Sequence, residues 1–355
     1  MIRINEIIYN LSKNQLPSEC NFVEAVNNIS AEEKSLLFST ARNVCATSYD
    51  NRVFMRGLIE FSSYCKQNCK YCGLRASNNN AQRYRLSEEE ILDVCESGHE
   101  IGFNTFVLQG GEDPYFDDEK IVSIVEKIKN KYPECAVTLS IGEKSRESYQ
   151  KYFDAGADRY LLRHETASKK LYSELHPGMD FDNRVRCLWD LKEIGFQVGA
   201  GFMVGLPGQS ASELYQDLSF LKELQPHMVG IGPFIPHKDT PLANENAGTL
   251  EMTLIMIAFV RLILPQALMP ATTALGTIDP QGRESGVLAG ANVVMPNLSP
   301  SNVREKYSLY DNKICVNDAA EKCRYCIERK INLVGYEIDM SRGDHSSRGR
   351  VNVCR

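Results

Sequence analysis

The sequence has no long uninterrupted hydrophobic run. Its longest apolar stretch, Leu254 to Leu264, contains Arg261 and is too short to cross a bilayer. The first residues of the chain are polar and lack the apolar core of a secretion signal. The sequence therefore predicts a cytoplasmic protein that does not interact with a membrane.

The sequence also has no excess of positive charge, since it contains 40 Lys and Arg residues and 46 Asp and Glu residues. The resulting net charge of -6 argues against a nucleic-acid partner. Hydrophobic residues make up 43% of the chain, which is typical of a globular protein. With 355 residues, the chain is long enough for one large barrel or two ordinary domains.

Cysteine, by contrast, is abundant, with 12 residues. Without an export signal, this number indicates metal binding or catalysis rather than a disulfide framework. Two groups of three are close in the sequence: Cys65, Cys69 and Cys72, and Cys315, Cys323 and Cys326. The others are scattered, and we interpret them as small buried side chains or unreactive thiols. These are Cys20, Cys45, Cys95, Cys135, Cys187 and Cys354.

Short predicted strands and helices alternate along most of the chain. The strands are expected at 54–61, 105–109, 136–140, 159–163, 197–204, 228–232, 268–272 and 292–296. The helices are expected at 31–49, 87–102, 118–131, 145–155, 182–194, 210–224, 249–264 and 282–289. Eight strands alternating with helices over about 240 residues match a complete (β/α)8 TIM barrel. A doubly wound open sheet is the alternative.

Three parts are expected along the chain. Residues 1–50 form an N-terminal helical segment that packs on the barrel, and residues 51–300 form the α/β barrel itself. Residues 301–355 form a C-terminal extension that carries the second cysteine group. In such a barrel, the chemistry lies at the carboxyl ends of the strands, where the first cysteine group also falls.

The first cysteine group has the spacing C-x3-C-x2-C. Iron–sulfur clusters normally take four cysteines, so a cubane held by three cysteines keeps one iron open to another ligand. A structural zinc site is the alternative, but zinc prefers four closed ligands. The nearest histidine in the sequence is His99, which is not close to this motif.

This motif, with Tyr71 before its third cysteine, resembles the signature of the radical S-adenosylmethionine (SAM) superfamily. Longer strings resemble one branch of it, the HydE family of radical SAM maturases for FeFe-hydrogenase. The resemblance extends from about Arg56 to Cys326. These strings are Tyr71–Arg75, Val107–Tyr115, Arg159–Thr166, Val204–Gln209, Gly230–His237 and Pro270–Ala274.

The resemblance implies a 4Fe-4S cluster on Cys65, Cys69 and Cys72, and SAM bound at its open iron. The expected reaction is reductive cleavage of SAM to a 5′-deoxyadenosyl radical. The implied role is assembly of the FeFe-hydrogenase active-site cluster on a cysteine-bound iron carbonyl cyanide precursor. Expected partners are other hydrogenase maturases and a reductant such as ferredoxin or flavodoxin.

The resemblance also assigns residues to SAM. Gly110, Gly111 and Glu112 match the glycine-rich stretch that receives the amino group of SAM. Glu165 is expected to bind the ribose, and Arg184 the carboxylate of SAM, because a guanidinium binds carboxylates in a bidentate manner. The alternative for Glu165 and Arg184 is an ion pair at the surface. The other expected cofactor contacts are Tyr71, Gln109 and Ser140.

A polar cavity is expected inside the barrel. Residues 159, 161, 163 and 165 share one face of a strand, and two arginines inside a barrel are costly unless they are paired or face a polar ligand. We therefore expect Arg159 and Arg163 to contact an anionic substrate, with internal ion pairs as the alternative. His164 faces outward by the same alternation. Other positions that resemble the family's cavity lining are Met228, Thr272, Thr273 and Tyr307.

The second cysteine group, Cys315, Cys323 and Cys326, resembles an accessory site present in only some HydE relatives. It is expected to hold a second iron–sulfur cluster, 2Fe-2S or 4Fe-4S, that is not essential for catalysis. Free thiols, an adventitious metal site and a zinc site are the alternatives.

Other functions stay open at this point. A methylornithine-synthase-like mutase or a biotin-synthase-like enzyme would share the barrel and the first cysteine motif. A non-enzymatic iron–sulfur scaffold is a more distant alternative, because SAM-type residues at several strand ends argue against it.

Overall fold

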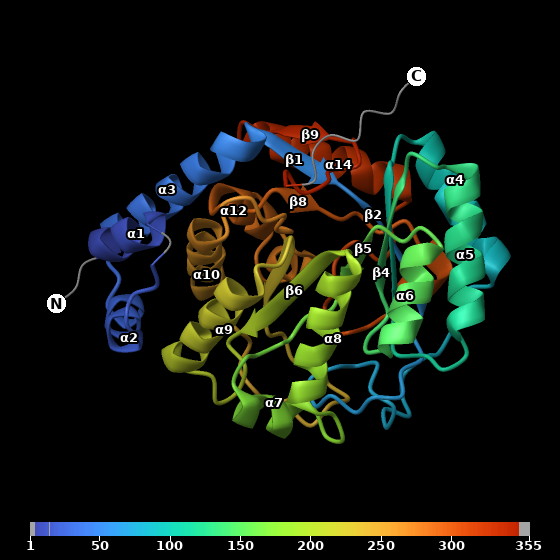
Figure 1. The fold of residues 1–355 in the computed structure, drawn as a ribbon, viewed down its shortest axis with the longest axis horizontal. Helices are drawn as coiled ribbons and strands as arrows, with labels where there is room; N and C mark the ends of the chain where they lie inside the picture. The colour runs from blue at the N-terminus through green and yellow to red at the C-terminus, as the bar shows by residue number, and fades with distance from the viewer. Residues whose placement is uncertain (1–3, 14, 348–355) are drawn as a thin grey trace.

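A computed structural model describes residues 4–13 and 15–347, and its strands form two hydrogen-bonded groups (Figure 1). The larger group has the order β2–β3–β4–β5–β6–β7, and the smaller has the order β8–β1–β9. The strands are β1 (Arg52–Met55), β2 (Gly57–Ser62), β3 (Thr105–Gly110), β4 (Ala136–Ser140), β5 (Arg159–Leu161), β6 (Gln197–Val204), β7 (Met228–Pro233), β8 (Val293–Val294) and β9 (Glu337–Asp339). All pairings between these strands are parallel.

Isolated bridges join the two groups into a closed barrel. Leu58 pairs with Asn297, Met228 with Leu268, and Pro270 with Val293. The fold is therefore the predicted TIM-type barrel and not an open sheet. The strand expected at 268–272 appears only as bridges, because Pro270 has no N–H group to continue a ladder.

Helices surround the strands, and their capping residues explain where they begin (Figure 1). Capping boxes start α3 at Ser30 and α4 at Ser87, as the Ser–Glu spacing indicates. The helices are α1 (Ile4–Ser12), α2 (Glu19–Asn27), α3 (Ala31–Tyr49), α4 (Glu88–Glu100), α5 (Asp118–Lys131), α6 (Arg146–Asp154), α7 (Lys169–Leu175), α8 (Phe181–Ile194), α9 (Ala211–Leu224), α10 (Leu250–Ile263), α11 (Thr273–Ile278), α12 (Gly282–Leu288), α13 (Ser301–Arg304) and α14 (Ala320–Leu333).

The longest apolar run of the sequence forms α10, which is buried from Thr253 to Ile263. One side of α10 faces the barrel strand β7, and α1 and α3 cover the other side. A helix that is apolar all round is stable when it is enclosed in this way. Within residues 4–13 and 15–347, every helix is too short or too polar to serve as a membrane span.

The C-terminal residues close the amino end of the barrel, where β9 pairs with β1. Next to β9, the Asp344 carboxylate accepts hydrogen bonds from Arg159 Nη2 at 2.7 Å and from Gln197 Nε2 at 2.6 Å. Both donors are first residues of barrel strands. The extension is thus part of the barrel's closure, and residues 348–355 lie outside the described residues. The division at residues 50 and 300 remains a prediction.

Replacing Asp344 by alanine should destabilise the protein, because it leaves the fully buried Arg159 without its counter-charge. Loss of one partner of a buried ion pair typically costs 3–5 kcal/mol, and the partial exposure of Asp344 reduces the expected cost to about 2–4 kcal/mol. Glu193→Ala is the matched control, since its side chain is 62% exposed and its partner Arg146 keeps Asp190. Urea unfolding of the full chain measures both variants.

The stability lost in Asp344→Ala should also depend on pH. Burial alone would raise the pKa of Asp344, but the guanidiniums of Arg159 and Arg342 hold this pKa well below its ordinary value. A carboxylate with a depressed pKa stabilises the fold above its unfolded-state pKa, near 4, and loses this contribution as the pH falls. The difference between wild type and Asp344→Ala should therefore shrink below about pH 4. An unchanged difference between pH 7 and pH 3 would contradict the assignment.

Candidate active site

The first cysteine group lies in the loop that follows β2, at the carboxyl end of the barrel (Figure 1). All three thiols are free and half-buried. Two backbone N–H groups point at sulfur: Gln67 N lies 3.4 Å from Cys65 Sγ, and Leu74 N lies 3.4 Å from Cys72 Sγ. Such hydrogen bonds to sulfur tune iron–sulfur clusters. The loop is thus arranged as a cluster-binding loop.

The spacing of the three sulfur atoms argues against a single zinc ion. Among the described residues, these sulfurs are not all within 4.8 Å of one another. A tetrahedral zinc ion with Zn–S bonds of 2.3 Å holds its thiolates only about 3.8 Å apart. Burial raises the pKa of Cys72 to about 12 and also raises the pKa of Cys65 and Cys69, so binding of iron must displace thiol protons.

Tyr71 is held in place by a histidine that the sequence did not point to. Its hydroxyl lies 2.8 Å from His176 Nε2, and His176 Nδ1 lies 2.8 Å from the carbonyl oxygen of Tyr172. Because the carbonyl can only accept, Nδ1 carries the proton and Nε2 accepts from Tyr71. Burial lowers the pKa of His176 to about 3, which keeps this histidine neutral.

The glycine-rich stretch lies against the cysteine loop, as predicted. A Cβ atom on Gly111 would stand 2.2 Å from the carbonyl oxygen of Tyr64 and 2.7 Å from Cys65 Cβ, so only glycine fits there. Next to it, the Glu112 carboxylate accepts a 2.6 Å hydrogen bond from Gln67 Nε2, inside the cysteine loop. The backbone of this stretch therefore lies close enough to the cysteine loop to contact a molecule bound to a cluster there.

Strand register places three polar side chains side by side above the barrel core. Glu60 on β2 pairs with Gln109 on β3, which pairs with Ser140 on β4. Glu60 is 1% exposed and forms a 2.6 Å ion pair with Lys313. Sequence reasoning did not select Glu60, although a carboxylate inside an apolar strand was the available signal.

Tyr307 joins this polar layer. Its fully buried hydroxyl accepts a 3.3 Å hydrogen bond from Gln109 Nε2, and Lys313 lies 5.1 Å from its ring centroid. The structure thus brings Gln109, Ser140 and Tyr307 together at the carboxyl side of the barrel. Their contact with a cofactor or a substrate remains a prediction.

Glu165 adopts a strained backbone conformation just beyond β5, with φ at 66°. A left-handed φ outside glycine is uncommon and often marks functional sites. Glu165 Oε2 lies 3.1 Å from Arg163 Nη2, yet this oxygen and both Nε and Nη2 of Arg163 are buried without a well-aligned hydrogen bond. These atoms are therefore available to a polar ligand, and the expected contact of Glu165 with SAM remains a prediction.

Arg184 is fixed beside them by two partners. Its Nε donates to Glu143 Oε1 at 2.6 Å, and its Nη1 donates to the carbonyl oxygen of Arg163 at 2.7 Å. Arg184 is 7% exposed, so its ion pair with Glu143 is buried and is not the surface ion pair that was the alternative in the sequence. Nη2 makes no hydrogen bond to the described residues, and it is the atom that remains for a carboxylate.

Arg159 does not join this group. It lies in register with Thr138, two residues before Ser140, and its guanidinium binds Asp344 at the amino end of the barrel. Its charge therefore has an internal partner, and the structure removes the physical reason for expecting a substrate anion there. The distant Asp344 could not be recognised as its partner in the sequence.

The barrel interior contains a small cavity, and Arg159, which was expected to contact a substrate inside the barrel, is not among the residues that line it. It measures about 20 Å³, and the residues that line it include Arg56, Thr138 and Met228. Arg56 is 4% exposed and donates to Met228 Sδ at 3.1 Å, while Arg56 Nε and Thr138 Oγ1 are buried without a partner. The structure thus places the predicted Met228 at this cavity, together with Arg56, which sequence reasoning missed. Binding of an anion there remains a prediction.

Of the two threonines at the start of α11, Thr273 is linked to the second cysteine group through Arg283. Thr272 caps this helix, and Thr273 Oγ1 accepts a 3.2 Å hydrogen bond from Arg283 Nη2. Arg283 Nη1 lies 3.7 Å from Cys315 Sγ. Cys323 donates to Cys315, and this hydrogen bond lowers the pKa of Cys315 to about 5. The structure brings these two cysteines together; a second cluster on them and on the exposed Cys326 remains a prediction.

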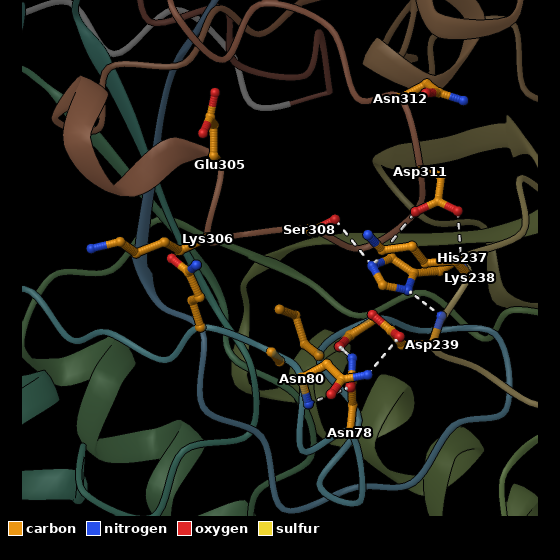
Figure 2. Close-up of a pocket in the computed structure, with 14 residues that line it drawn as sticks. Asn78, Asn80, His237, Lys238, Asp239, Glu305, Lys306, Ser308, Asp311 and Asn312 are labelled. Carbon is orange, nitrogen blue, oxygen red and sulfur yellow. Dashed lines mark hydrogen bonds and ion pairs between the residues drawn. The ribbon is translucent and has the colours of Figure 1, made fainter.

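A pocket of about 430 Å³ opens beside the cysteine loop, next to Gly73 (Figure 2). In it, the backbone N–H of Asp239 donates to His237 Nδ1 at 3.1 Å, so Nε2 carries the proton and donates to Ser308 Oγ at 3.2 Å. These two hydrogen bonds fix the orientation of the His237 ring. His164 lies outside the barrel, as expected, where it is fully buried 3.1 Å from Asp217.

Comparisons with known proteins agree with this geometry. Residues 59–221 match the family model of the Radical SAM superfamily. The chain is 51% identical over 299 residues to the [FeFe] hydrogenase maturase subunit HydE of Thermotoga maritima, covering 84% of this chain and 85% of that protein. It is 34% identical over 289 residues to 3-methylornithine synthase of Methanosarcina acetivorans, covering 80% and 81%.

Solved structures agree on the fold. The crystal structure of methylornithine synthase (PylB) matches with a TM-score of 0.81 and 27% identity, over 94% of this chain and 97% of that one. HydG, a maturase of the [FeFe]-hydrogenase, matches with a TM-score of 0.79 and 22% identity, over 95% and 76%.

The barrel, the three-cysteine loop and these matches define a radical SAM enzyme. Membership in this superfamily implies a 4Fe-4S cluster and SAM, and the N–H groups directed at sulfur and the close approach of Gly111 fit both. Within the superfamily, the chain belongs to the HydE family of [FeFe] hydrogenase maturases.

Gly111→Ala should lower the iron content of the reconstituted protein. The added methyl group would overlap the Tyr64 carbonyl oxygen and Cys65 Cβ, so the cysteine loop has to move away. Gly110→Ala is the matched control, because its added methyl group meets only the Phe61 ring, at 3.1 Å. Iron and sulfide analysis after anaerobic reconstitution measures both, and equal iron in the two variants would contradict the close-approach argument.

Proposed function

We propose that this chain cleaves SAM reductively and acts in the assembly of the [FeFe] hydrogenase active-site cluster. The observation that carries the proposal is the cysteine loop, which lies against Gly111 and Glu112 and is half-buried at the barrel mouth. The identity of 51% to a HydE protein supports the maturation role. The proposed substrate is a cysteine-bound iron carbonyl cyanide unit delivered by another maturase.

When bound, the cluster and SAM supply a 5′-deoxyadenosyl radical, which the protein has to generate away from water. Cys65, Cys69 and Cys72 would hold three irons of the cluster, and the fourth iron would stay open to SAM. Gly110 and Gly111 let the backbone approach the amino group of SAM, since neither carries a side chain.

Glu165 and Arg184 would fix the rest of SAM. The unpartnered Oε2 of Glu165 can accept from a ribose hydroxyl, and the remaining Nη2 of Arg184 can donate to the SAM carboxylate. Glu143 holds Arg184 at 2.6 Å and so keeps its guanidinium oriented before SAM binds. Preorganised donors lower the cost of ordering the ligand.

The substrate would occupy the polar interior below SAM. Arg163 Nε near the end of β5, together with Arg56 Nε and Thr138 Oγ1 deeper in the barrel, offers buried polar atoms without a hydrogen-bond partner. Cyanide and carboxylate groups of an iron-bound cysteine are acceptors for these atoms. The enclosing barrel excludes water from the radical and limits side reactions.

Cys69→Ala should abolish SAM cleavage, because it removes one of three cluster ligands. The assay is anaerobic incubation with SAM and dithionite, with 5′-deoxyadenosine measured by chromatography and the reduced cluster followed by electron paramagnetic resonance. Cys323→Ala is the matched control, which should lose iron from the second group and still cleave SAM. Turnover by Cys69→Ala would refute the cluster assignment.

Glu165→Gln should raise KM for SAM with a smaller effect on kcat. A hydrogen bond that involves a charged group contributes about 1.5–3 kcal/mol, which corresponds to a change of about 10- to 100-fold. Glu174→Gln on the exposed face of α7 is the control and should leave KM unchanged. An unchanged KM in Glu165→Gln would show that this carboxylate does not contact SAM.

A mutase of the methylornithine-synthase type is the second candidate, because the chain is 34% identical to such a protein. Two assays separate the candidates. The first tests whether this chain restores hydrogenase activity in cells that lack their own HydE, and the second tests whether it forms 3-methylornithine from lysine, the unbranched isomer. Formation of 3-methylornithine without restored hydrogenase activity would replace the maturase proposal.

A further inference from the structure

A second group of metal-ligating side chains lies at the amino end of the barrel, opposite the cysteine loop. It consists of His99 in the last turn of α4, together with Glu134 and Cys135 just before β4. One ligand atom from each lies within 4.8 Å of the other two, and no other such group exists among residues 4–13 and 15–347. No part of the proposed reaction uses it.

Several atoms that can accept a hydrogen bond or bind a cation surround the Cys135 sulfur. Sγ lies 3.7 Å from His99 Nδ1, 3.9 Å from Asn104 Oδ1 and 4.0 Å from Glu134 Oε1. A thiol has one proton to donate, and even these contacts are long for it. Sγ also lies 4.0 Å from the carbonyl oxygen of Phe103. One thiol proton cannot satisfy four acceptor-type atoms, whereas a cation can bind the sulfur and several of these atoms at once.

The distances match those across one tetrahedral zinc ion. Zinc bonds of 2.3 Å to sulfur and about 2.0–2.2 Å to nitrogen or oxygen place neighbouring ligand atoms about 3.6 Å apart. The observed separations from Cys135 Sγ, between 3.7 and 4.0 Å, need only small movements to reach this value. Thiolate, imidazole and carboxylate together favour Zn²⁺ over Mg²⁺ or Ca²⁺.

The neighbouring positive charges do not occupy the ligand atoms. Lys129 donates to the carbonyl oxygen of Cys135 at 2.7 Å, and Arg342 donates to the carbonyl oxygen of Glu134 at 2.9 Å. Both also form ion pairs with Asp158, which offsets their charge. The side chains of Glu134 and Cys135 therefore stay available.

The group is accessible and oriented. Cys135 is fully buried, whereas Glu134 is exposed and His99 half-exposed, so an ion can enter from solvent. The Tyr132 ring packs on the His99 imidazole, with centroids 4.3 Å apart. A packed ring limits the rotation of the imidazole and reduces the entropy that binding would cost.

We propose that His99, Glu134 and Cys135 bind one Zn²⁺ ion, with Asn104 Oδ1 or a water molecule as the fourth ligand. Such an ion would connect the C-terminal end of α4 to the beginning of β4, at the end of the barrel that carries no chemistry. Its role would be structural, because metal that binds only the folded state stabilises that state.

The test uses the full chain with its reconstituted cluster, exposed anaerobically to zinc chloride and then desalted. Wild type should retain one more zinc per chain than His99→Gln, and zinc X-ray absorption should show sulfur and imidazole ligands. In competition with a chelator, His99→Gln should bind zinc more than about 10-fold more weakly, since loss of an outer-shell partner alone has that effect. SAM cleavage should be the same in both proteins, which shows that the variant is folded.

Two further variants separate this site from the other cysteines. Glu100→Gln, the exposed neighbour of His99, should retain the zinc, and Cys135→Ala should lose it. Equal zinc in wild type and His99→Gln would overturn the proposal. Loss of zinc only in Cys326→Ser would place the ion in the second cysteine group and overturn it as well.

Discussion

The parallel direction of the barrel strands is the constraint on which the site depends. Because the barrel strands run the same way, their carboxyl ends meet at one rim, and residues far apart in the chain become neighbours there. The cysteine loop after β2, the glycines after β3 and Glu165 after β5 are brought together by this geometry alone. The loops can vary while the strands hold the arrangement.

Buried charge distinguishes structural from functional polar groups in this molecule. Arg159 with Asp344 and Glu60 with Lys313 are each compensated by an ion pair inside the protein. A buried charge without a partner is costly, so compensated groups need no ligand.

Buried polar atoms without a hydrogen-bond partner occur at several places among the described residues, and some of them lie at the mouth of the barrel or inside it. Glu165 and Arg163 at the rim, and Arg56 and Thr138 deeper inside, all have buried polar atoms without a hydrogen-bond partner. In the proposed function, these atoms bind SAM and the substrate.

The sequence predicted those features that depend on local chemistry. Helices α3 and α5 have the predicted bounds, because a capping serine or aspartate and the apolar spacing lie within the segment itself. The cysteine motif was readable for the same reason. The closure of the barrel was predicted from the alternation of elements, although the bridges at Pro270 depend on a ladder partner that the local pattern does not reveal.

What could not be predicted are partners that are distant in the chain. Arg159 and Asp344 are 185 residues apart, so the sequence alone could not decide between an internal ion pair and a substrate contact. Arg56 was hidden because it follows an apolar strand and looked like part of it. Glu60 was missed for the same reason, since its partner Lys313 lies in the C-terminal extension.

The two ends of the barrel therefore have different tasks. The amino end holds the Arg159–Asp344 pair and the added strand β9, which tie the C-terminal residues to the barrel. The proposed zinc site at His99, Glu134 and Cys135 would add a further link there. At the carboxyl end, polar atoms of Arg163 and Glu165 are buried without a well-aligned hydrogen bond, and the backbone of Glu165 is strained. Strain at a reactive site has to be offset elsewhere, and the amino end is where this fold supplies the compensating interactions. Changes at the amino end should accordingly act on stability, and changes at the carboxyl end on binding and chemistry.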